Sequence, residues 1–372
     1  MADVFVHVGL PKTGTTTIQG ALAARVAALA EAGVLFPTGS HRGQRLAAYD
    51  LVGQRVKGDD SQVVAGAFAR LLTEMEGFSG RSIVVSEEEL GLARPHHVRK
   101  IVRGLPDHRI FVVIGLRDIA RNVVSAWQQA VLMGSTTRWQ RFIEGVREPG
   151  RGDVALGAGF WVRQDPMRVI DAWSTQVPVE RIRVVTVPPS GADSSTLLER
   201  FAAATELPIP LWNSDEVLER NVSLGAAGTE LIRRLNESVV GPLNAHQYRH
   251  VVQHGIRHGL KVADPRPLRL PAEHLPWARD YGQKLVAELQ RRGILVFGDL
   301  ADLVPRETKT GSGQLDEVSE AELLCAAEAA LASLAIAHGR LFRRYRRAFF
   351  ERHRRFPSTT ELLGSAARVT GF

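Results

Sequence analysis

The sequence predicts an α/β fold with a central parallel sheet covered by helices. Four short apolar runs, each typical of a buried strand, alternate along the chain with segments of helical periodicity. These runs are apolar throughout, which indicates a sheet that is covered on both faces. The chain has 372 residues, 44% of them hydrophobic and 23% charged, which suffices for one large domain with an appendage.

The first half of the chain alternates between three predicted strands and four predicted helices. Short, β-rich apolar runs predict strands at 4–8, 83–85 and 110–114. Helical periodicity predicts helices over 14–32, 62–76, 95–103 and 119–133. Residues 34–60 should be irregular, because glycine, proline and serine interrupt any periodicity there.

The second half supplies one more strand, at 182–187, with helices before and after it. The predicted helical segments are 161–175, 194–204, 226–238, 274–292 and 317–356. Residues 305–313 are polar and contain glycine, which is typical of a linker. We therefore divide the chain into an α/β domain over 1–304 and, over 305–372, a linker with a basic helical appendage.

The segment between the first strand and the first helix predicts a phosphate site. Residues 9–17 are Gly-Leu-Pro-Lys-Thr-Gly-Thr-Thr-Thr. A glycine-containing turn at this place directs backbone N–H groups and the positive end of a helix at an anion. A nucleotide-kinase loop has its lysine directly after the second glycine, where this chain has Thr15; the lysine here, Lys12, precedes Gly14 by two residues. The displaced lysine argues against an ATP-hydrolysing enzyme.

A second polar motif follows the strand predicted at 110–114. Arg117 comes just past the end of that strand, and Ser125 lies eight residues later, about two turns along the next helix. Open α/β sheets place ligand-binding residues at such strand ends, and the planar guanidinium suits phosphate oxygens. The alternative for Arg117 is an ion pair at the start of the helix with Asp118 or a neighbouring glutamate.

Together, the two motifs resemble those of the sulfotransferases that use 3′-phosphoadenosine 5′-phosphosulfate (PAPS). The resemblance covers about residues 3–205. It implies a three-layer, P-loop-like α/β domain with a central parallel sheet, and the residues 17–19 after the loop look more like bacterial and carbohydrate sulfotransferases. The chain departs from the family after the fourth strand, where many members have an acidic residue and this chain has Thr-Val-Pro-Pro at 186–189.

The resemblance also implies a role for each matching residue. The loop would hold the 5′-phosphate, the Arg–Ser pair would hold the 3′-phosphate, and Lys12 would stabilise charge on the oxygen between phosphate and sulfate. No metal is expected, because the lysine and the helix ends supply the positive charge. The residues that would bind the donor are Lys12, Thr13, Gly14, Thr15, Thr16, Arg117 and Ser125.

Acidic residues follow the strand predicted at 83–85, at the same edge of the sheet. The acceptor hydroxyl needs a general base, which in the family is usually Glu or His. Like charges crowded at 87–89 would raise the pKa of at least one carboxyl. We take Glu87 as the base, with Glu88 next and His41 as the rival; an acidic residue that only stabilises a helix start is the alternative for either glutamate. His7, in the first strand, is expected to be a core residue.

These inferences predict a sulfotransferase that moves a sulfuryl group from PAPS to a hydroxyl of a small-molecule or carbohydrate acceptor, by resemblance a carbohydrate or glycolipid. One alternative is a P-loop kinase or NTPase. The other is a non-catalytic binder of an anionic polymer or membrane through the arginine-rich tail. No nucleic acid partner is expected.

The charge of the chain favours anionic partners, because its formal net charge is +7. Arginines concentrate over 340–355, in an amphipathic helix with Leu341, Tyr345 and Phe349 at helical spacing. This helix either contacts an anionic membrane over 340–356 or, more commonly for such helices, packs its aromatic residues on the domain. The first apolar run is too short for a signal peptide or a membrane span, so we expect a cytoplasmic protein.

Overall fold

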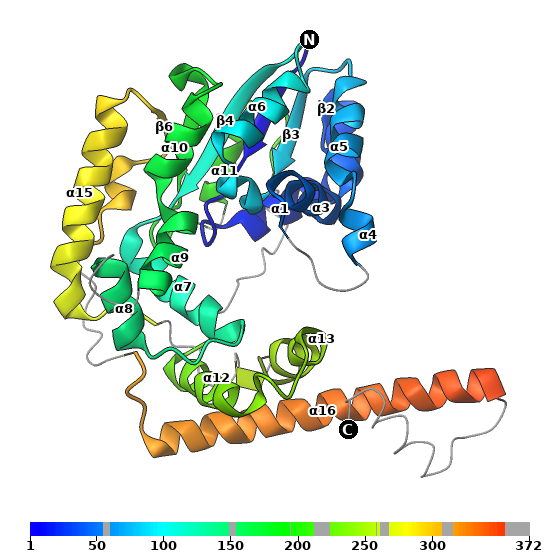
Figure 1. Ribbon diagram of the computed structural model, residues 1–372, viewed down its shortest axis with the longest axis vertical. Helices are drawn as coiled ribbons and strands as arrows, with labels where there is room; N and C mark the ends of the chain where they lie inside the picture. Colours follow the sequence, from blue (N-terminus) through cyan, green and yellow to red (C-terminus); the bar gives the residue numbers. More distant parts are fainter. Residues whose placement is uncertain are drawn as a thin grey trace. The chain divides into compact units, whose positions relative to one another are not determined.

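A computed structural model of the chain describes residues 1–54, 60–148, 154–193, 195–211, 224–257, 259–260, 268–306 and 315–353. The fold is α/β, with a central six-stranded parallel sheet and a long helix near the C-terminus (Figure 1). The chain divides into two compact units. The first comprises residues 1–125, 144–219 and 272–309, and the second comprises 126–143, 220–271 and 310–372.

The second unit therefore contains more than the C-terminal appendage expected from residue 305 onward. Two earlier segments belong to it as well, and hydrogen bonds between its segments show why. Asn236 donates from Nδ2 to the carbonyl oxygens of Val131 (2.8 Å) and Ser135 (2.9 Å), and the Trp139 amide donates to Asp316 (3.1 Å). Hydrophobic periodicity predicts single helices and strands, and it does not show which distant segments form hydrogen bonds with each other. The predicted linker falls mostly on residues 307–314, which lie outside the described residues.

The central sheet is parallel throughout and has the strand order β2-β3-β1-β4-β5-β6. The strands are β1 (Asp3–His7), β2 (Val34–Leu35), β3 (Ser82–Ser86), β4 (Arg109–Leu116), β5 (Ile182–Thr186) and β6 (Leu295–Phe297). The four predicted strands are confirmed as β1, β3, β4 and β5. The edge strands β2 and β6 were not predicted, because two and three residues are too few to show a period.

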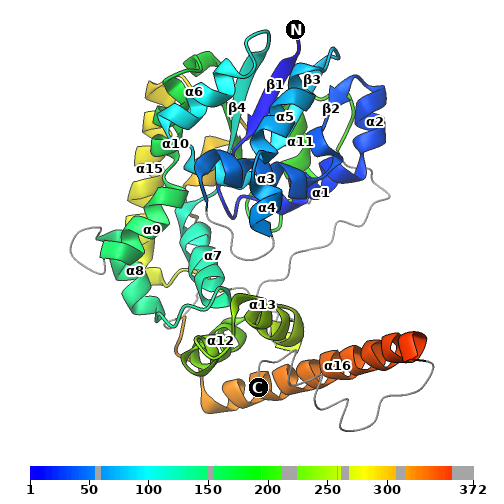
Figure 2. The same ribbon diagram turned by 45° about the vertical axis from the view of Figure 1, so that its right-hand side comes forward.

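Helices cover both faces of the sheet, as the continuously apolar strands predict (Figure 2). Successive strand residues point to opposite faces, so Val4 and Val6 of β1 lie in one core cluster and Phe5 lies in the other. The first cluster packs under α3 (His41–Val52), α5 (Ala67–Glu76), α6 (Pro95–Arg103), α10 (Pro166–Ser174) and α15 (Leu275–Arg291). The second packs under α1 (Thr15–Ala24), α2 (Val26–Glu31) and α11 (Thr196–Ala204).

The expectation of an irregular 34–60 segment is wrong, because it contains β2, a short 3₁₀ helix at Pro37–Gly39 and the twelve-residue helix α3. Ser40 caps the start, where its Oγ accepts from the amide of Gly43 (3.4 Å). Gly53 ends the helix in the left-handed conformation, with φ 69°. The buried face is largely small, with Ala47 and Ala48 ahead of Leu51, so its periodicity is weak beside the glycines of the segment. Residues 55–59 lie outside the description.

Three predicted helices are each divided in two. Residues 14–32 form α1 and α2, 62–76 form α4 (Asp60–Val64) and α5 with Gly66 at φ 73° between them, and 161–175 are covered by α9 (Val154–Gln164) and α10. Asp165 starts α10, because its carboxylate accepts from the amide of Met167 (2.9 Å). The remaining elements of the first unit, wholly or in part, are η1 (Pro37–Gly39), η2 (Glu88–Leu92), α7 (Ile119–Leu132), α8 (Trp139–Arg147), η3 (Val179–Arg181), η5 (Ala272–His274) and η6 (Leu300–Leu303).

The second unit is built around α12 (Ala226–Val239), α13 (Ala245–Tyr248), η4 (Arg249–Ile256) and α16 (Glu320–His353). The first half of α16 packs on α12 and η4. Ser333 of α16 donates to the Gly255 carbonyl (2.6 Å) and accepts from the Gly259 amide (3.2 Å), a close approach that small residues on both sides permit. Within the described part of the chain, α16 alone has the length and apolar composition of a membrane-crossing helix.

Substitution of Leu51 tests whether α3, which the sequence did not predict, packs on the core as a helix. Leu51→Ala should lower the free energy of unfolding by about 2–5 kcal/mol, because it removes a buried side chain of α3 from the core. Arg42→Ala, at an exposed position of the same helix, should change it by less than about 0.5 kcal/mol. Urea unfolding of both variants measures the difference. Equal, small effects would mean that this segment does not pack as a helix.

Candidate functional site

The strand order reverses direction at the carboxyl edge of the sheet, between β1 and β4. The chain leaves β1 toward β2 on one side and leaves β4 toward β5 on the other, so the two connections diverge there. Open α/β sheets bind ligands at such a divergence. The loop of residues 9–14 follows β1 and Arg117 follows β4, so both predicted motifs meet at this point.

The loop of residues 9–14 leads directly into helix α1. Gly9 and Gly14 have φ values of 88° and 84°, and Lys12 also takes a left-handed conformation, with φ 68°. That conformation costs a non-glycine residue about 1 kcal/mol or more, so the surrounding contacts must impose it. Gly14 precedes α1 and no side chain caps the helix, so the first amides of α1 are turned toward the loop without a side-chain acceptor.

Gly115, at the end of β4, lets the loop lie against the sheet. Its carbonyl accepts from the Leu10 amide (3.0 Å), and its own amide donates to the Gly9 carbonyl. A Cβ on Gly115 would lie 2.7 Å from Oγ1 of Thr13, so a larger residue would displace the loop. The Thr13 hydroxyl donates to the Leu10 carbonyl (2.6 Å), and it therefore holds the loop rather than facing a ligand.

Two buried side chains that the sequence did not single out hold the loop from another side. Gln164 of α9 donates to the Pro11 carbonyl (3.2 Å), and Asn122 of α7 donates to Oε1 of Gln164 (2.8 Å). Gln164 lies outside both motifs, and Asn122 lies between Arg117 and Ser125 without a role expected from the sequence. Only their position in space reveals the role, because α9 follows the loop by some 150 residues along the chain.

Arg117 is a largely buried guanidinium to which no carboxylate is hydrogen-bonded among the described residues. Its Nη1 donates to Ser125 Oγ (3.3 Å) and to the Lys12 carbonyl (3.4 Å), and its buried Nε has no hydrogen-bond partner in the described part of the chain. Burial, with a smaller contribution from the charge of Arg121, lowers the pKa of Arg117 to about 10. The group remains charged at neutral pH.

The alternative for Arg117, an ion pair with Asp118, is not formed. The Asp118 carboxylate instead pairs with the guanidinium of Arg121 and accepts from the Arg121 amide (2.9 Å). Arg121 also donates to the carbonyls of Pro188 (2.9 Å) and Val187 (3.3 Å). A buried charge is costly unless it is paired, so the position of Arg117 favours an anionic ligand beside it.

Glu88 contacts the phosphate loop. Its Oε2 accepts from the Thr15 hydroxyl (2.8 Å), and a Cβ on Gly9 would lie 3.1 Å from its own Cβ. Thr15 is the first residue of α1, where the positive helix end stabilises a carboxylate. Glu88 therefore lies where an incoming phosphate would compete with it, which does not suit the role of second candidate base. Thr16, by contrast, is exposed.

Glu87 is buried where β3 ends, with 1% of its surface exposed. Its Oε1 accepts from the Glu89 amide (3.4 Å) at the start of η2. Burial raises the pKa of Glu87 to about 8, and the neighbouring charges of Glu88 and Glu89 act in the same direction. At neutral pH the carboxyl is thus mostly protonated.

His41 lies against Glu87, so the structure brings the two candidate bases together. Nδ1 of His41 is 3.3 Å from Oε2 of Glu87. Burial, and then the positive charge of Arg45, lower the pKa of His41. At neutral pH the contact therefore joins an uncharged imidazole to a carboxylic acid rather than forming an ion pair. Because Glu88 contacts Thr15, the Glu87–His41 pair lies at the same edge of the sheet as the loop.

A network of buried hydrogen bonds joins the strands and helices next to this edge of the sheet. His7 and Ser86 are hydrogen-bonded through Nδ1 and Oγ (2.7 Å), and the Ser86 backbone bonds the side chains of Gln19 (3.0 Å) and Gln44 (2.8 Å). Burial lowers the pKa of His7 to about 3, so the ring is neutral. The expectation of a core histidine is confirmed, and the network ties β1, β3, α1 and α3 together just before Glu87.

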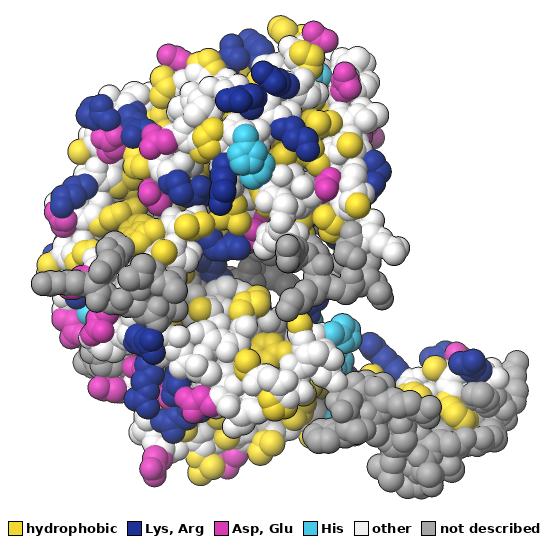
Figure 3. Space-filling view, viewed as in Figure 1, with side chains coloured by type: hydrophobic (Ala, Val, Ile, Leu, Met, Phe, Trp, Pro, Cys, Tyr) yellow, Lys and Arg dark blue, Asp and Glu magenta, His cyan; other side chains and the backbone are white. Residues whose placement is uncertain are grey.

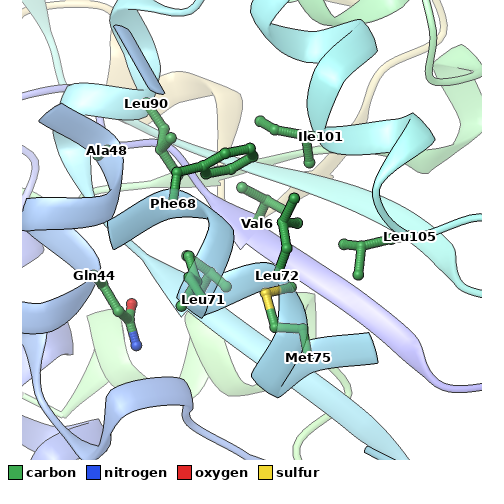
Figure 4. Close-up of a pocket in the computed structure, with 11 residues that line it drawn as sticks. Val6, Gln44, Ala48, Phe68, Leu71, Leu72, Met75, Leu90, Ile101 and Leu105 are labelled. Carbon is green, nitrogen blue, oxygen red and sulfur yellow. The ribbon is translucent and has the colours of Figure 1, made fainter. Parts of the chain in front are cut away.

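The cavity beneath α3 and α5 is a packing defect rather than a ligand site. It holds about 20 Å³, close to the space for one water molecule (Figure 4). Its wall is apolar apart from Gln44, whose amide already bonds the Pro37 carbonyl and the Ser86 amide.

Comparison of the chain with protein-family models, with curated proteins and with solved structures gives no match.

The raised pKa of Glu87 predicts how the stability of the protein changes with pH. Its folded pKa of about 8 exceeds the usual value of 4.5, so the folded state binds the additional proton between these values. The stability from this proton is fully present below pH 4.5 and is lost as the pH rises through about 8. As the pH rises, the free energy of unfolding of the wild type should fall by up to about 1.4 kcal/mol per pH unit relative to that of Glu87→Gln, whose side chain stays neutral.

Urea unfolding of both proteins at several pH values between 5 and 8 measures this. Glu76→Gln, at an exposed position of α5, is the control and should show no such trend. A difference between wild type and Glu87→Gln that stays constant with pH would contradict a raised pKa.

Proposed function

We propose that this protein is a PAPS-dependent sulfotransferase, which transfers a sulfuryl group to an acceptor hydroxyl and leaves 3′-phosphoadenosine 5′-phosphate (PAP). The assignment of the α/β unit to the P-loop-like sulfotransferase architecture is part of this proposal. One observation carries it: a buried guanidinium, Arg117, has no carboxylate hydrogen-bonded to it and bonds both Ser125 and the carbonyl of Lys12 in the loop.

PAPS carries phosphates at two positions, and the site offers two groups of hydrogen-bond donors. The amides at the start of α1, with the hydroxyl of Thr16, suit the 5′-phosphate. Arg117 and Ser125 suit the 3′-phosphate, which would neutralise the buried guanidinium and engage its unpaired Nε. The residues present therefore fit a ligand with two separate phosphate groups.

Lys12 is the residue that we assign to charge stabilisation. Bound PAPS would supply the sulfuryl group, and transfer builds negative charge on the oxygen that bridges phosphorus and sulfur. An ammonium group on a loop of fixed conformation stabilises such charge without reorganisation. Hydrogen bonds from Thr13, Gln164 and Arg117 to loop carbonyls hold that conformation.

Donor binding competes with the bond between Glu88 and Thr15. A phosphate at the start of α1 and the Glu88 carboxylate would be two anions at one helix end, so Glu88 must leave Thr15 when the donor binds. Glu88 thereby stabilises the free loop without being required for the chemistry.

We assign the removal of the acceptor proton to Glu87, with His41 as its positioning partner. A carboxyl with a pKa of about 8 is a stronger base than an ordinary glutamate once it is deprotonated. Its deprotonated fraction rises with pH, and the neutral imidazole lies 3.3 Å away without forming a hydrogen bond to it, so a small rotation of either side chain would let His41 orient the carboxyl. The proton passes from the acceptor hydroxyl to Glu87 as the oxygen attacks sulfur.

Substitution of Arg117 tests the donor site. Arg117→Ala should weaken PAP binding at least about 30-fold, because it removes a buried charge from the 3′-phosphate. Adenosine 5′-phosphate, which lacks that phosphate, should bind the wild type weakly and lose little further affinity in the variant. Ser125→Ala should weaken PAP binding about 2- to 10-fold. Calorimetry gives these five affinities, and equal losses of PAP and adenosine 5′-phosphate affinity in Arg117→Ala would contradict the assignment.

The pH dependence of turnover tests the base. For the wild type, kcat should rise with pH up to about 8, following deprotonation of Glu87. Glu87→Gln should lower kcat by about 10²–10⁴-fold and abolish the rise while PAP affinity stays the same. His41→Ala should shift the profile and lower kcat less. Full turnover of Glu87→Gln would exclude Glu87 as the base.

A further inference from the structure

The terminal segment of α16, residues 340–353, differs from the part of the helix that precedes it. The preceding part is held on its neighbours along one side, where Ala326 and Ala330 are buried and Ser333 is bonded to η4, while Leu324, Leu331 and Ile336 are exposed. In the terminal segment, Leu341 and Phe342 are each 39% exposed and Phe350 is 38% exposed. Leu341 and Phe342 thus remain accessible to solvent, whereas Tyr345 and Phe349 are half-buried.

Residues 340–349 of the terminal segment have an apolar face and a cationic face, while beyond them Phe350 falls on the cationic side and Arg352 on the apolar side. Residues on each face recur three and four positions apart, which is the spacing of one side of a helix. The apolar face consists of Leu341, Phe342, Tyr345, Ala348 and Phe349. The opposite face consists of Arg340, Arg343, Arg344 and Arg347. Figure 3 shows apolar and basic side chains beside each other at this end of the helix.

The charge of the terminal segment is strongly one-sided. Residues 340–353 contain six arginines and a single acidic residue, Glu351, which pairs with Arg347 (3.0 Å). An anionic surface would satisfy this charge, and each arginine near such a surface adds to the attraction. Long arginine side chains also extend from a buried helix toward charged head groups.

We propose that the terminal segment is a membrane-surface helix, which lies in the interface of an anionic lipid bilayer. Leu341, Phe342 and Phe349 would enter the acyl boundary, and the arginines would meet the lipid head groups. The combination of apolar and cationic faces selects this partner. A nucleic acid would engage the arginines but leave the exposed Leu341 and Phe342 in water, and two terminal segments paired together would bring both arginine clusters into contact.

The segment lies on the membrane rather than crossing it. The apolar part of α16 that precedes it contains Glu328 and is held on η4 through Ser333, so it is not free to form a lipid-facing span. The terminal segment has 14 residues, about 21 Å of helix, which is shorter than a hydrocarbon core.

Co-flotation of the full chain with lipid vesicles tests the proposal. The protein should float with vesicles that contain phosphatidylglycerol and not with vesicles of phosphatidylcholine alone, and high salt should release it. Leu341→Asp combined with Phe342→Asp, or Arg343→Gln combined with Arg344→Gln, should each lower the bound fraction at least about tenfold. Circular dichroism and the thermal midpoint should show that both variants remain folded.

Two control variants sharpen the test. Arg99→Gln combined with Arg103→Gln removes the same charge from exposed positions of α6, and Leu324→Asp alters an exposed leucine of α16 outside the terminal segment. Both should float as the wild type does. Equal flotation with neutral vesicles, no flotation, or loss of flotation in the controls would overturn the proposal, as would resistance to alkaline carbonate extraction, which indicates a span.

Discussion

The burial of Arg117 without a hydrogen-bonded carboxylate is the constraint on which the candidate site depends. A charged guanidinium away from water is tolerated when hydrogen bonds or a counter-ion compensate it, and its bonds to Ser125 and the Lys12 carbonyl compensate it only in part. The same bonds tie the end of β4 to the loop after β1. The geometry of the loop and the anion binding that we propose for it therefore depend on the same side chain.

Much of this arrangement follows from the sequence. Continuous apolar runs gave the four main strands and their parallel pairing, and parallel pairing alone places the residues after β1, β3 and β4 at one edge of the sheet. That is why Lys12, Glu87 and Arg117 could be grouped before their positions were known. The identity of the anion, by contrast, rests on the resemblance to sulfotransferase motifs, and the spacing of residues does not supply it.

Other features depend on contacts that no periodicity records. Gln164 and Asn122 support the loop from helices distant in sequence, and Glu88 turns toward Thr15 although it resembles its neighbour Glu87 in type and place. Helix α3 was not predicted from the sequence, because alanines make up much of its buried face and its hydrophobic periodicity is therefore weak. Its presence brings His41 to Glu87, so two residues considered as rival bases form one pair.

Nucleotide selectivity of the unmodified protein tests the central claim most directly. Calorimetric titration with PAP, ADP and ATP, each with and without Mg²⁺, compares a ligand with a 3′-phosphate to ligands with extended 5′-phosphates. The account predicts that PAP binds more tightly than ADP or ATP and that Mg²⁺ does not change its affinity. Tight, Mg²⁺-dependent binding of ATP without binding of PAP would contradict it and indicate a phosphoryl-transfer enzyme.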